Sequence, residues 1–104
     1  MLNVTIAGEE ASPARALLWN TPNPFAGSTR ISFSVPAGGR ATVSIFDAAG
    51  RKVSEIYSGE VTGGLNNFAW NGRDRSGREL SSGVYFCKIE IGSISISRKM
   101  LKIK

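Results

Sequence analysis

The chain has 104 residues, of which 41% are hydrophobic and 20% are charged, and it carries a formal net charge of +5. This length suits one domain with one hydrophobic core, and the content of aromatic and β-branched residues excludes a disordered chain. No apolar run approaches the roughly 20 residues that cross a bilayer, so we expect no membrane span.

The start of the chain is predicted to be an N-terminal extension. Residues 2–6 alternate like a short strand or the tail of an upstream module, and residues 8–14 have the polar composition of a linker. The segment has neither a basic region nor a long apolar stretch, so it is not a signal peptide. Either the domain is cytosolic or its export signal lies further upstream. We expect residues 1–15 to form the linker and residues 16–104 to form the domain.

From residue 16 onward, apolar and polar residues alternate with a period of two, and no helical stripe is present. A short strand at residues 16–19 leads into residues 20–25, where Pro22 and Pro24 forbid continued strand pairing and indicate an ordered extended turn. Short strands at such even spacing predict an all-β fold, an immunoglobulin-like antiparallel β-sandwich of about seven strands. The further strands are predicted at residues 30–35, 41–46, 51–57, 66–70, 83–91 and 94–104.

The alternation also predicts which side chains face the interior, because residues two apart in a strand lie on one face. In the strands at residues 30–35, 41–46 and 66–70, most apolar residues share one phase. The predicted core consists of Ile31, Phe33, Val35, Val43, Ile45, Phe68 and Trp70.

Two connections carry strong turn signals. Residues 47–50 form a four-residue hairpin loop in which Asp47 can accept backbone N–H bonds and Gly50 can adopt a positive φ. In residues 71–78, the oxygens of Asn71, Asp74 and Ser76 faintly resemble a calcium loop. The arginines of that segment would repel a divalent cation, so turn capping is the favoured role.

The last strand contains a conflict of phase. Ile94 and Ile96 share one phase, whereas Leu101 and Ile103 share the opposite one. One strand cannot present both pairs to one core without an irregularity. We therefore expect a bulge or bend between residues 97 and 100.

The sequence lacks the usual residues of catalysis. There is no histidine and only one cysteine, which removes the common general base, the Ser-His triads and the zinc-finger site. A glycosidase pair of Asp74 and Glu79 is disfavoured because both lie in an arginine-rich turn region. Cys87 lies in a strand pattern, so we expect a buried small hydrophobe. We predict no enzyme activity, no catalytic residue, no metal ligand and no cofactor.

Large aromatic side chains leave a binding function open. In a small sandwich such residues usually fill the core, but a carbohydrate-binding module uses them as flat stacking platforms. The candidates for such platforms are Trp19, Phe25, Phe46, Tyr57, Trp70 and Tyr85.

The end of the chain is basic. Arg98, Lys99, Lys102 and Lys104 fall within the last seven residues, and no acidic residue follows Glu90. A basic tail can bind nucleic acid or anionic lipid, but apolar residues alternate with these charges as they do in a strand. An edge strand protected by lysines is therefore favoured, and we expect no nucleic-acid partner.

Several stretches that occur in order resemble a known family. They are Asn-Thr-Pro-Asn-Pro-Phe at residues 20–25 with residues 29–36, Val-Ser-Ile-Phe-Asp-Ala-Ala-Gly-Arg-Lys-Val at residues 43–53, Trp-Asn-Gly-Arg-Asp at residues 70–74, Ser-Gly-Arg at residues 76–78, Ser-Gly-Val-Tyr-Phe at residues 82–86 and Lys-Met at residues 99–100. Together they resemble the type A C-terminal sorting domain of type IX secretion substrates, a pattern shared with the Ig-like domain of the flagellar hook-capping protein. The signature residues are Asn23, Pro24, Phe25, Asp47, Gly50, Arg51, Trp70, Gly77, Gly83 and Tyr85.

The resemblance implies a sorting signal that follows an upstream cargo domain. Such a domain reaches the cell surface through a transient periplasmic stage, is recognised by the outer-membrane secretion and attachment machinery, and is often cleaved there. By analogy, the cleavage linker would be Gly8, Glu9, Glu10, Ala11 and Ser12. The recognition surface would be Arg98, Lys99, Met100, Lys102 and Lys104, with the last strand adding to a partner's sheet or exchanging between copies.

A structural role of the signature residues remains open beside this function. As parts of a fold, Asn23 and Asp47 are expected to bond to local backbone, the glycines to supply turn conformations, and the three aromatic signature residues to fill the core. Similar modules serve as spacers or assembly units, so a structural Ig-like module of a multidomain extracellular or hook-cap protein is the alternative, with a carbohydrate-binding module as a second.

Overall fold

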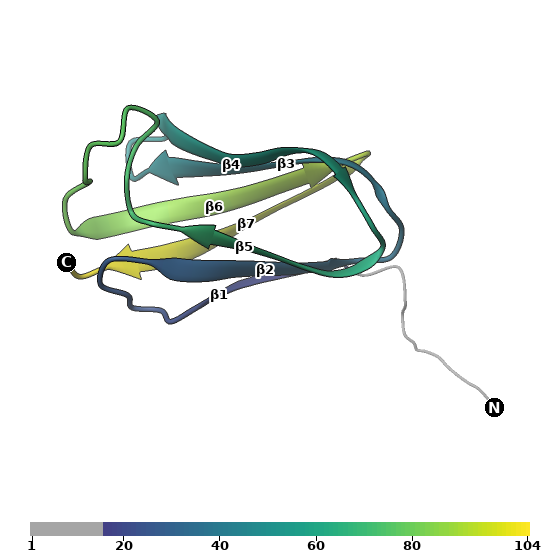
Figure 1. Ribbon diagram of the computed structural model, residues 1–104, viewed down its shortest axis with the longest axis horizontal. Helices are drawn as coiled ribbons and strands as arrows, with labels where there is room; N and C mark the ends of the chain where they lie inside the picture. The colour runs from purple at the N-terminus through teal and green to yellow at the C-terminus, as the bar shows by residue number, and fades with distance from the viewer. Residues whose placement is uncertain (1–15) are drawn as a thin grey trace.

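The computed structural model describes residues 16–104, which form two antiparallel sheets packed face to face (Figure 1). One sheet has the strand order β1-β2-β5 and the other has the order β4-β3-β6-β7. The predicted seven-stranded all-β sandwich is confirmed. The strands are β1 (Leu17–Thr21), β2 (Thr29–Val35), β3 (Gly39–Asp47), β4 (Lys52–Val61), β5 (Gly64–Trp70), β6 (Gly83–Ile91) and β7 (Ile94–Lys102).

The core lies between the two sheets, as the alternation predicted. Phe33 and Ile45 are fully buried, and Trp70 is 1% exposed. Phe68 is half-buried and packs against this cluster. Each buried side chain of this size contributes roughly 1.5–3 kcal/mol relative to an exposed one. The two sheets therefore hold together mainly through the predicted apolar faces.

Strand β4 is longer than predicted, because residues 58–61, expected in a connection, continue to pair with β3. Gly39 lies opposite Val61, and Ala41 lies opposite Gly59. Two register shifts interrupt this pairing, one between Val43 and Ser44 and one after Ile45. Because β4 lies at the edge of its sheet, it can take up the extra residues without disturbing the β3–β6 pairing.

Strand β7 shows no break, so the predicted bulge is wrong. Its pairing with β6 runs without a register shift from Ile94 to Lys102. The inward phase therefore continues to Lys102, which is 1% exposed, while Leu101 and Ile103 are 41% and 56% exposed. The prediction failed because it assigned these two aliphatic residues to the core, whereas the apolar stem of a lysine occupies that place.

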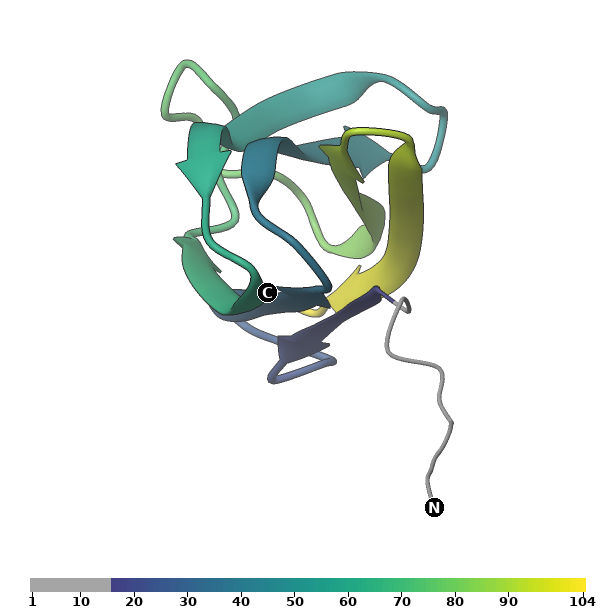
Figure 2. The ribbon, with the colours of Figure 1, turned by 90° about the vertical axis from the view of Figure 1, so that its right-hand side faces the viewer.

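The strands surround one interior when the molecule is seen end-on (Figure 2). The end of the sandwich that holds the C-terminus gathers the β1–β2, β3–β4 and β5–β6 connections, and β1 begins towards the other end (Figure 1). Within the described residues, no helix is long and apolar enough to span a membrane. The predicted linker, its possible strand at residues 2–6 and the candidate cleavage segment lie outside the described residues.

Candidate docking surface

The connection between β1 and β2 crosses to the other sheet and pairs with the end of β7. Phe25 N–H donates to the carbonyl oxygen of Leu101 at 3.0 Å, and Ile103 N–H donates to the carbonyl of Phe25 at 2.8 Å. Gly27 N–H donates to the carbonyl of Lys104 at 3.1 Å. The outer edge of β7 is thus already paired over its C-terminal part, which closes one side of the sandwich.

Asn23 reinforces this closure with its side chain. Its Oδ1 accepts a hydrogen bond from Leu101 N–H at 3.0 Å, and its Nδ2 donates to the carbonyl of Lys99 at 3.4 Å. The sequence predicted that Asn23 would bond to local backbone, and that prediction is wrong. Its partners are far away in sequence because the turn at residues 22–28 lies beside the last strand.

Three signature aromatics fill the core beneath this closure, as predicted. The Trp70 ring makes edge-on contacts with Phe25 and Tyr85, at centroid distances of 5.7 and 5.6 Å. Trp70 Nε1–H donates to the carbonyl of Arg73 at 3.0 Å, and the Tyr85 hydroxyl donates to the carbonyl of Ser81 at 2.7 Å. These two bonds satisfy the only polar atoms of the buried rings and fix the β5–β6 connection to the core.

The two predicted turns are held by carboxylates. Asp47 Oδ1 accepts the N–H groups of Ala49 and Arg51, and its Oδ2 accepts Arg51 Nε–H at 2.9 Å. The backbone hydrogen bond from Arg51 is the largest of the causes that lower the pKa of Asp47. Gly50 has a φ of 87°, in the left-handed region that glycine adopts readily. The hairpin prediction at residues 47–50 is confirmed.

Asp74 caps the second turn in the same way. Its Oδ1 accepts hydrogen bonds from the Ser76 N–H, the Ser76 hydroxyl and the Arg78 N–H, at 2.9, 2.7 and 3.0 Å. The Ser76 hydroxyl bond is the largest cause of the lowered pKa of Asp74. The capping role predicted for this aspartate is therefore observed. Gly77 follows with a φ of 88°.

The residues predicted to contact a partner are divided by the phase of β7. Lys99 and Lys104 are exposed, and Arg98 Nε–H donates to the carbonyl of Leu18 at 3.0 Å across the seam between the sheets. Met100 and Lys102 are 0% and 1% exposed. A partner of the folded domain can touch the first three side chains but not these last two, which support the surface from within.

Sequence reasoning missed the apolar residues that lie on the outward face at the C-terminal end of β7. Leu101 and Ile103 face outward next to Lys99, and the register places Leu101 opposite Val84 on β6. Phe86 lies opposite Lys99 on the same outward face. The signal was present, since Leu101 and Ile103 share the phase of Lys99, but the assumption that aliphatic residues face the core concealed it.

The six aromatic candidates for sugar binding differ in how far their rings are exposed. Phe25, Trp70 and Tyr85 are buried, whereas Phe46 is half-buried on the outer face of its sheet. Tyr57 stacks on Phe68 at 4.7 Å, and its hydroxyl donates to the carbonyl of Glu60. Among the six, only Trp19 is an exposed large ring, at 41%. The structure therefore brings no set of exposed rings together as a platform in the described part of the chain.

The next two observations concern the reactivity of Cys87 and the side chains that could bind a metal ion. Cys87 is buried, and desolvation raises the pKa of its thiol to about 12, so the thiolate that reacts with electrophiles is scarce at neutral pH. Across residues 16–104, no three His, Cys, Asp or Glu side chains are grouped closely enough to hold a metal ion.

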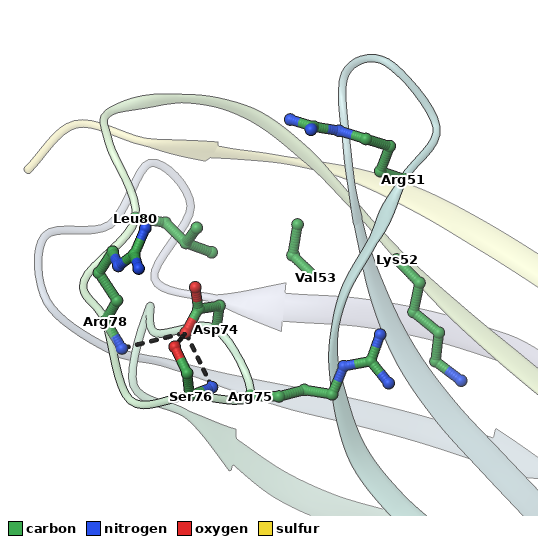
Figure 3. Close-up of a pocket in the computed structure, with 8 residues that line it drawn as sticks. All are labelled: Arg51, Lys52, Val53, Asp74, Arg75, Ser76, Arg78 and Leu80. Atoms are coloured by element: carbon green, nitrogen blue, oxygen red, sulfur yellow. Dashed lines mark hydrogen bonds between the residues drawn. The ribbon is translucent and has the colours of Figure 1, made fainter.

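A concavity lies at the end of the sandwich that holds the C-terminus (Figure 3). It has a volume of about 490 Å³ and is formed by the β3–β4 hairpin and the β5–β6 connection. Four of its eight lining residues are cationic, one is acidic, and the floor is apolar. The lining residues are Arg51, Lys52, Val53, Asp74, Arg75, Ser76, Arg78 and Leu80.

The family model of the FlgD Ig-like domain matches residues 20–93, which is most of the chain. The chain belongs to this family. Within the FlgD Ig-like domain family the module is structural, and the match indicates no catalytic family. No curated protein matches the chain.

Solved structures with a similar fold include PorU, PorZ and FlgD chains. Dimeric latent PorU from Porphyromonas gingivalis has a TM-score of 0.66 at 20% identity, covering 84% of this chain and 9% of that one. PorZ from the same organism, described as an essential bacterial surface component of the type-IX secretion system, has a TM-score of 0.55 at 24% identity, covering 84% and 11%. FlgD from Xanthomonas campestris has a TM-score of 0.58 at 21% identity, covering 85% and 67%.

The TM-scores show a shared fold for this member of the FlgD Ig-like domain family. The chain spans about a tenth of the length of the PorU and PorZ chains that it matches. It spans about two thirds of the FlgD chain.

Proposed function

We propose that this chain is a non-catalytic sorting domain of a secreted bacterial protein, recognised by the outer-membrane machinery of type IX secretion. Its place of action is the cell surface, and its cargo is an upstream domain. The likeness of fold to PorZ, a surface component of that system, supports the proposal. The observation that carries it is the surface formed by the outward residues of the last strand.

At the C-terminal end of that strand, the usual placement of apolar and charged side chains is inverted. Lys102 is buried, with its Nζ 3.7 Å from the Glu79 carboxylate, while Leu101 and Ile103 are exposed. Burying a lysine and exposing two aliphatic side chains both oppose folding. Exposed apolar side chains that lie together serve as contacts for partners.

The exposed aliphatic residues have cationic and aromatic neighbours. Lys99 and Lys104 flank them along the chain, and the half-buried side chains of Val84 and Phe86 continue the outward face onto β6. An apolar centre with a charged rim is the usual anatomy of a protein interface. The positive rim favours a partner whose contact surface is acidic, because charge complementarity accelerates and orients the encounter.

The mode of recognition differs from the addition of a strand to a partner's sheet. The backbone of residues 99–104 is already bonded to residues 23–27. A partner that binds the folded domain at this place must therefore use the side chains of the outward face. Exchange of the last strand between copies stays a prediction, and it requires the bonds from Asn23 and Phe25 to open first.

A reporter fusion tests the proposal. A reporter joined upstream of residues 1–104 is expected to reach the surface of a type IX-competent bacterium, and a reporter that remains in the periplasm would overturn the sorting function. The double variant Leu101→Ser/Ile103→Ser should reduce surface reporter at least tenfold. Leu65→Ser is the matched control, since Leu65 is 59% exposed on the other sheet. Export of the double variant at the control level would show that the docking surface lies elsewhere.

A structural assembly module is the second candidate, because the fold likeness covers 67% of the FlgD chain from Xanthomonas campestris and 71% of the FlgD chain from P. aeruginosa. That function predicts no export of the reporter. It also predicts that the purified chain associates with the structure to which its parent protein belongs. Failure of export together with such association would favour this candidate.

A further inference from the structure

A small concavity lies on the outer face of the four-stranded sheet, where the β3–β4 hairpin meets β6 and β7. Phe46 and Phe86 line it, together with residues of the hairpin and with Lys88 and Ser97. Its volume is about 260 Å³. Sites that enclose a drug-sized ligand have volumes of roughly 300–1,000 Å³. The concavity therefore has the size for one side chain of a partner and not for a larger ligand.

The pairing of the strands places two aromatic side chains and a lysine in one row. Phe46 on β3 lies opposite Phe86 on β6, which in turn lies opposite Lys99 on β7. Side chains directly opposite each other in antiparallel strands have Cβ atoms about 4.5–5.5 Å apart. All three face outward, because one adjacent residue in each strand is buried in the core. The row thus joins two aromatic rings to an exposed cation.

The rim of the concavity is cationic. Lys88 Nζ lies 5.9 Å from the centroid of the Phe46 ring and 3.7 Å from a carboxylate oxygen of Glu90, which is longer than a hydrogen bond. Lys99 is exposed and forms no ion pair within residues 16–104. The carboxylate of Asp47, in the lining, is occupied by hydrogen bonds within its own turn. Both ammonium groups can therefore still donate to a carboxylate of a partner.

The concavity continues into the apolar residues at the end of β7. Val84 lies two residues before Phe86 on the same outward face of β6, and it lies opposite Leu101. Two residues along a strand span roughly 7 Å, so a segment of about four residues can contact Leu101 and reach the concavity at the same time.

We propose that the concavity receives one aromatic or large aliphatic side chain of the protein that docks on β7, from within an acidic segment of that protein. Phe46 and Phe86 contact this side chain, and Lys88 and Lys99 bind the carboxylates beside it. The inference rests on the proposed function for the identity of the partner, and it supplies the chemistry by which that partner is recognised. Anchors of this kind, inserted into a pocket, can dominate the affinity of an interface.

Titration of the chain of residues 1–104 with short capped peptides tests the site without the secretion machinery. The peptide Asp-Asp-Phe-Asp-Asp is expected to cause saturable shifts in the ¹H–¹⁵N spectrum at residues 46–50, 86–88 and 97–99. Asp-Asp-Ala-Asp-Asp and Lys-Lys-Phe-Lys-Lys should bind at least tenfold more weakly, because the first lacks the anchor and the second lacks the negative charge. The proposal is wrong if the acidic phenylalanine peptide causes no shifts, or if it binds no better than the other two.

Two variants of β7 locate the binding. Ser97 is exposed at the rim of the concavity, so Ser97→Trp should fill it and weaken binding of the acidic phenylalanine peptide at least tenfold. Ser95→Trp is the matched control, because it adds the same ring two residues earlier on the same face, outside the lining, and it should change affinity less than twofold. Equal losses in the two variants would overturn the proposal.

The same variants in the reporter fusion connect the site to export. When the parent reporter reaches the surface, Ser97→Trp should lower surface reporter at least tenfold and Ser95→Trp less than twofold. Normal export of the Ser97→Trp reporter would overturn the anchor site while the sorting function stands. A parent reporter that stays in the periplasm, although the acidic phenylalanine peptide binds, would refute the sorting function and support the site.

Discussion

The Oδ1 atom of Asn23 lies 3.0 Å from the backbone nitrogen of Leu101 and accepts its hydrogen, although the two residues are 78 positions apart. Asn23 also donates to the carbonyl of Lys99. One side chain thus fastens the first connection of the chain to its last strand. The stability of the whole sandwich should depend on this contact, because without it the edge of β7 loses bonds on the side that faces β1.

Replacing Asn23 tests this dependence. Asn23→Ala removes both side-chain hydrogen bonds and should lower the free energy of unfolding by about 1–2 kcal/mol, measured by urea denaturation. Ser95→Ala, at an exposed position of β7, serves as the control and should change the free energy of unfolding by less than about 0.5 kcal/mol. Equal effects of the two substitutions would show that the closure contributes nothing specific.

Gly72 supports the same region from the other side. Its φ is +75°, and a Cβ atom there would lie 2.7 Å from both the carbonyl oxygen of Gly27 and the Cε of Lys102. Gly72→Ala should therefore cost about 2–5 kcal/mol through backbone strain and overpacking.

Gly77 is the matched position, with a φ of +88° and open space within 4 Å of the point where a Cβ atom would lie. Gly77→Ala should cost only about 1–2 kcal/mol, since strain remains but no atom must move. Thermal and urea unfolding of both variants measure the difference. A loss for Gly72→Ala no larger than that for Gly77→Ala would refute the close packing around Lys102.

Lys102 should stabilise the fold through its stem and not through its charge. Lys102→Met keeps a long apolar side chain and removes the need to bury an ammonium group, so stability should stay within about 1 kcal/mol of the parent or rise. Lys102→Ala leaves a cavity and should cost about 2–5 kcal/mol. If urea denaturation shows equal losses for the two variants, the ion pair with Glu79 is the dominant contribution.

The thiol of Cys87 should be unreactive towards thiol reagents in the folded protein. Its pKa is raised by desolvation to about 12, so reaction with a thiol reagent at pH 8 should be slow until urea unfolds the chain. Rapid labelling at pH 8 without denaturant would contradict the burial of this side chain.

The same shift makes stability depend on pH. The folded state holds the thiol proton up to about pH 12, while the unfolded chain releases it near the ordinary value of 9.0. This contribution is complete below pH 9 and is lost as the pH rises towards 12, because the unfolded state then binds fewer protons. Cys87→Ala should therefore show a shallower loss of stability in this window, by up to about 1.4 kcal/mol per pH unit. Parallel pH profiles would disprove it.

The sequence predicted the strands and the core because alternation is a local property. Phe33, Ile45 and Trp70 each lie where the pattern places them. The hairpin at residues 47–50 was equally predictable, since Asp47 and Gly50 bond and bend within the turn itself. Strands, core positions and turns could be predicted because each depends on residues that are close in the sequence.

Features that depend on distant segments could not be predicted in this way. The partner of Asn23 is set by the crossing of the first connection to β7, and the concavity lined by Arg75 and Arg78 is set by the approach of the hairpin to a different loop. The phase of β7 was misjudged for a related reason. Whether Lys102 or Ile103 faces the interior depends on the unbroken register between β7 and β6. The residues of β7 alone do not specify that register.

The pairing of residues 23–27 with residues 99–104 also orders events in time. During synthesis the early connection has no partner until residues 99–104 have left the ribosome, and contacts between such distant segments form slowly. The sheets can begin to assemble sooner, but the seam closes last. A nascent chain of this kind stays open for an interval in which a chaperone or an export factor can hold it.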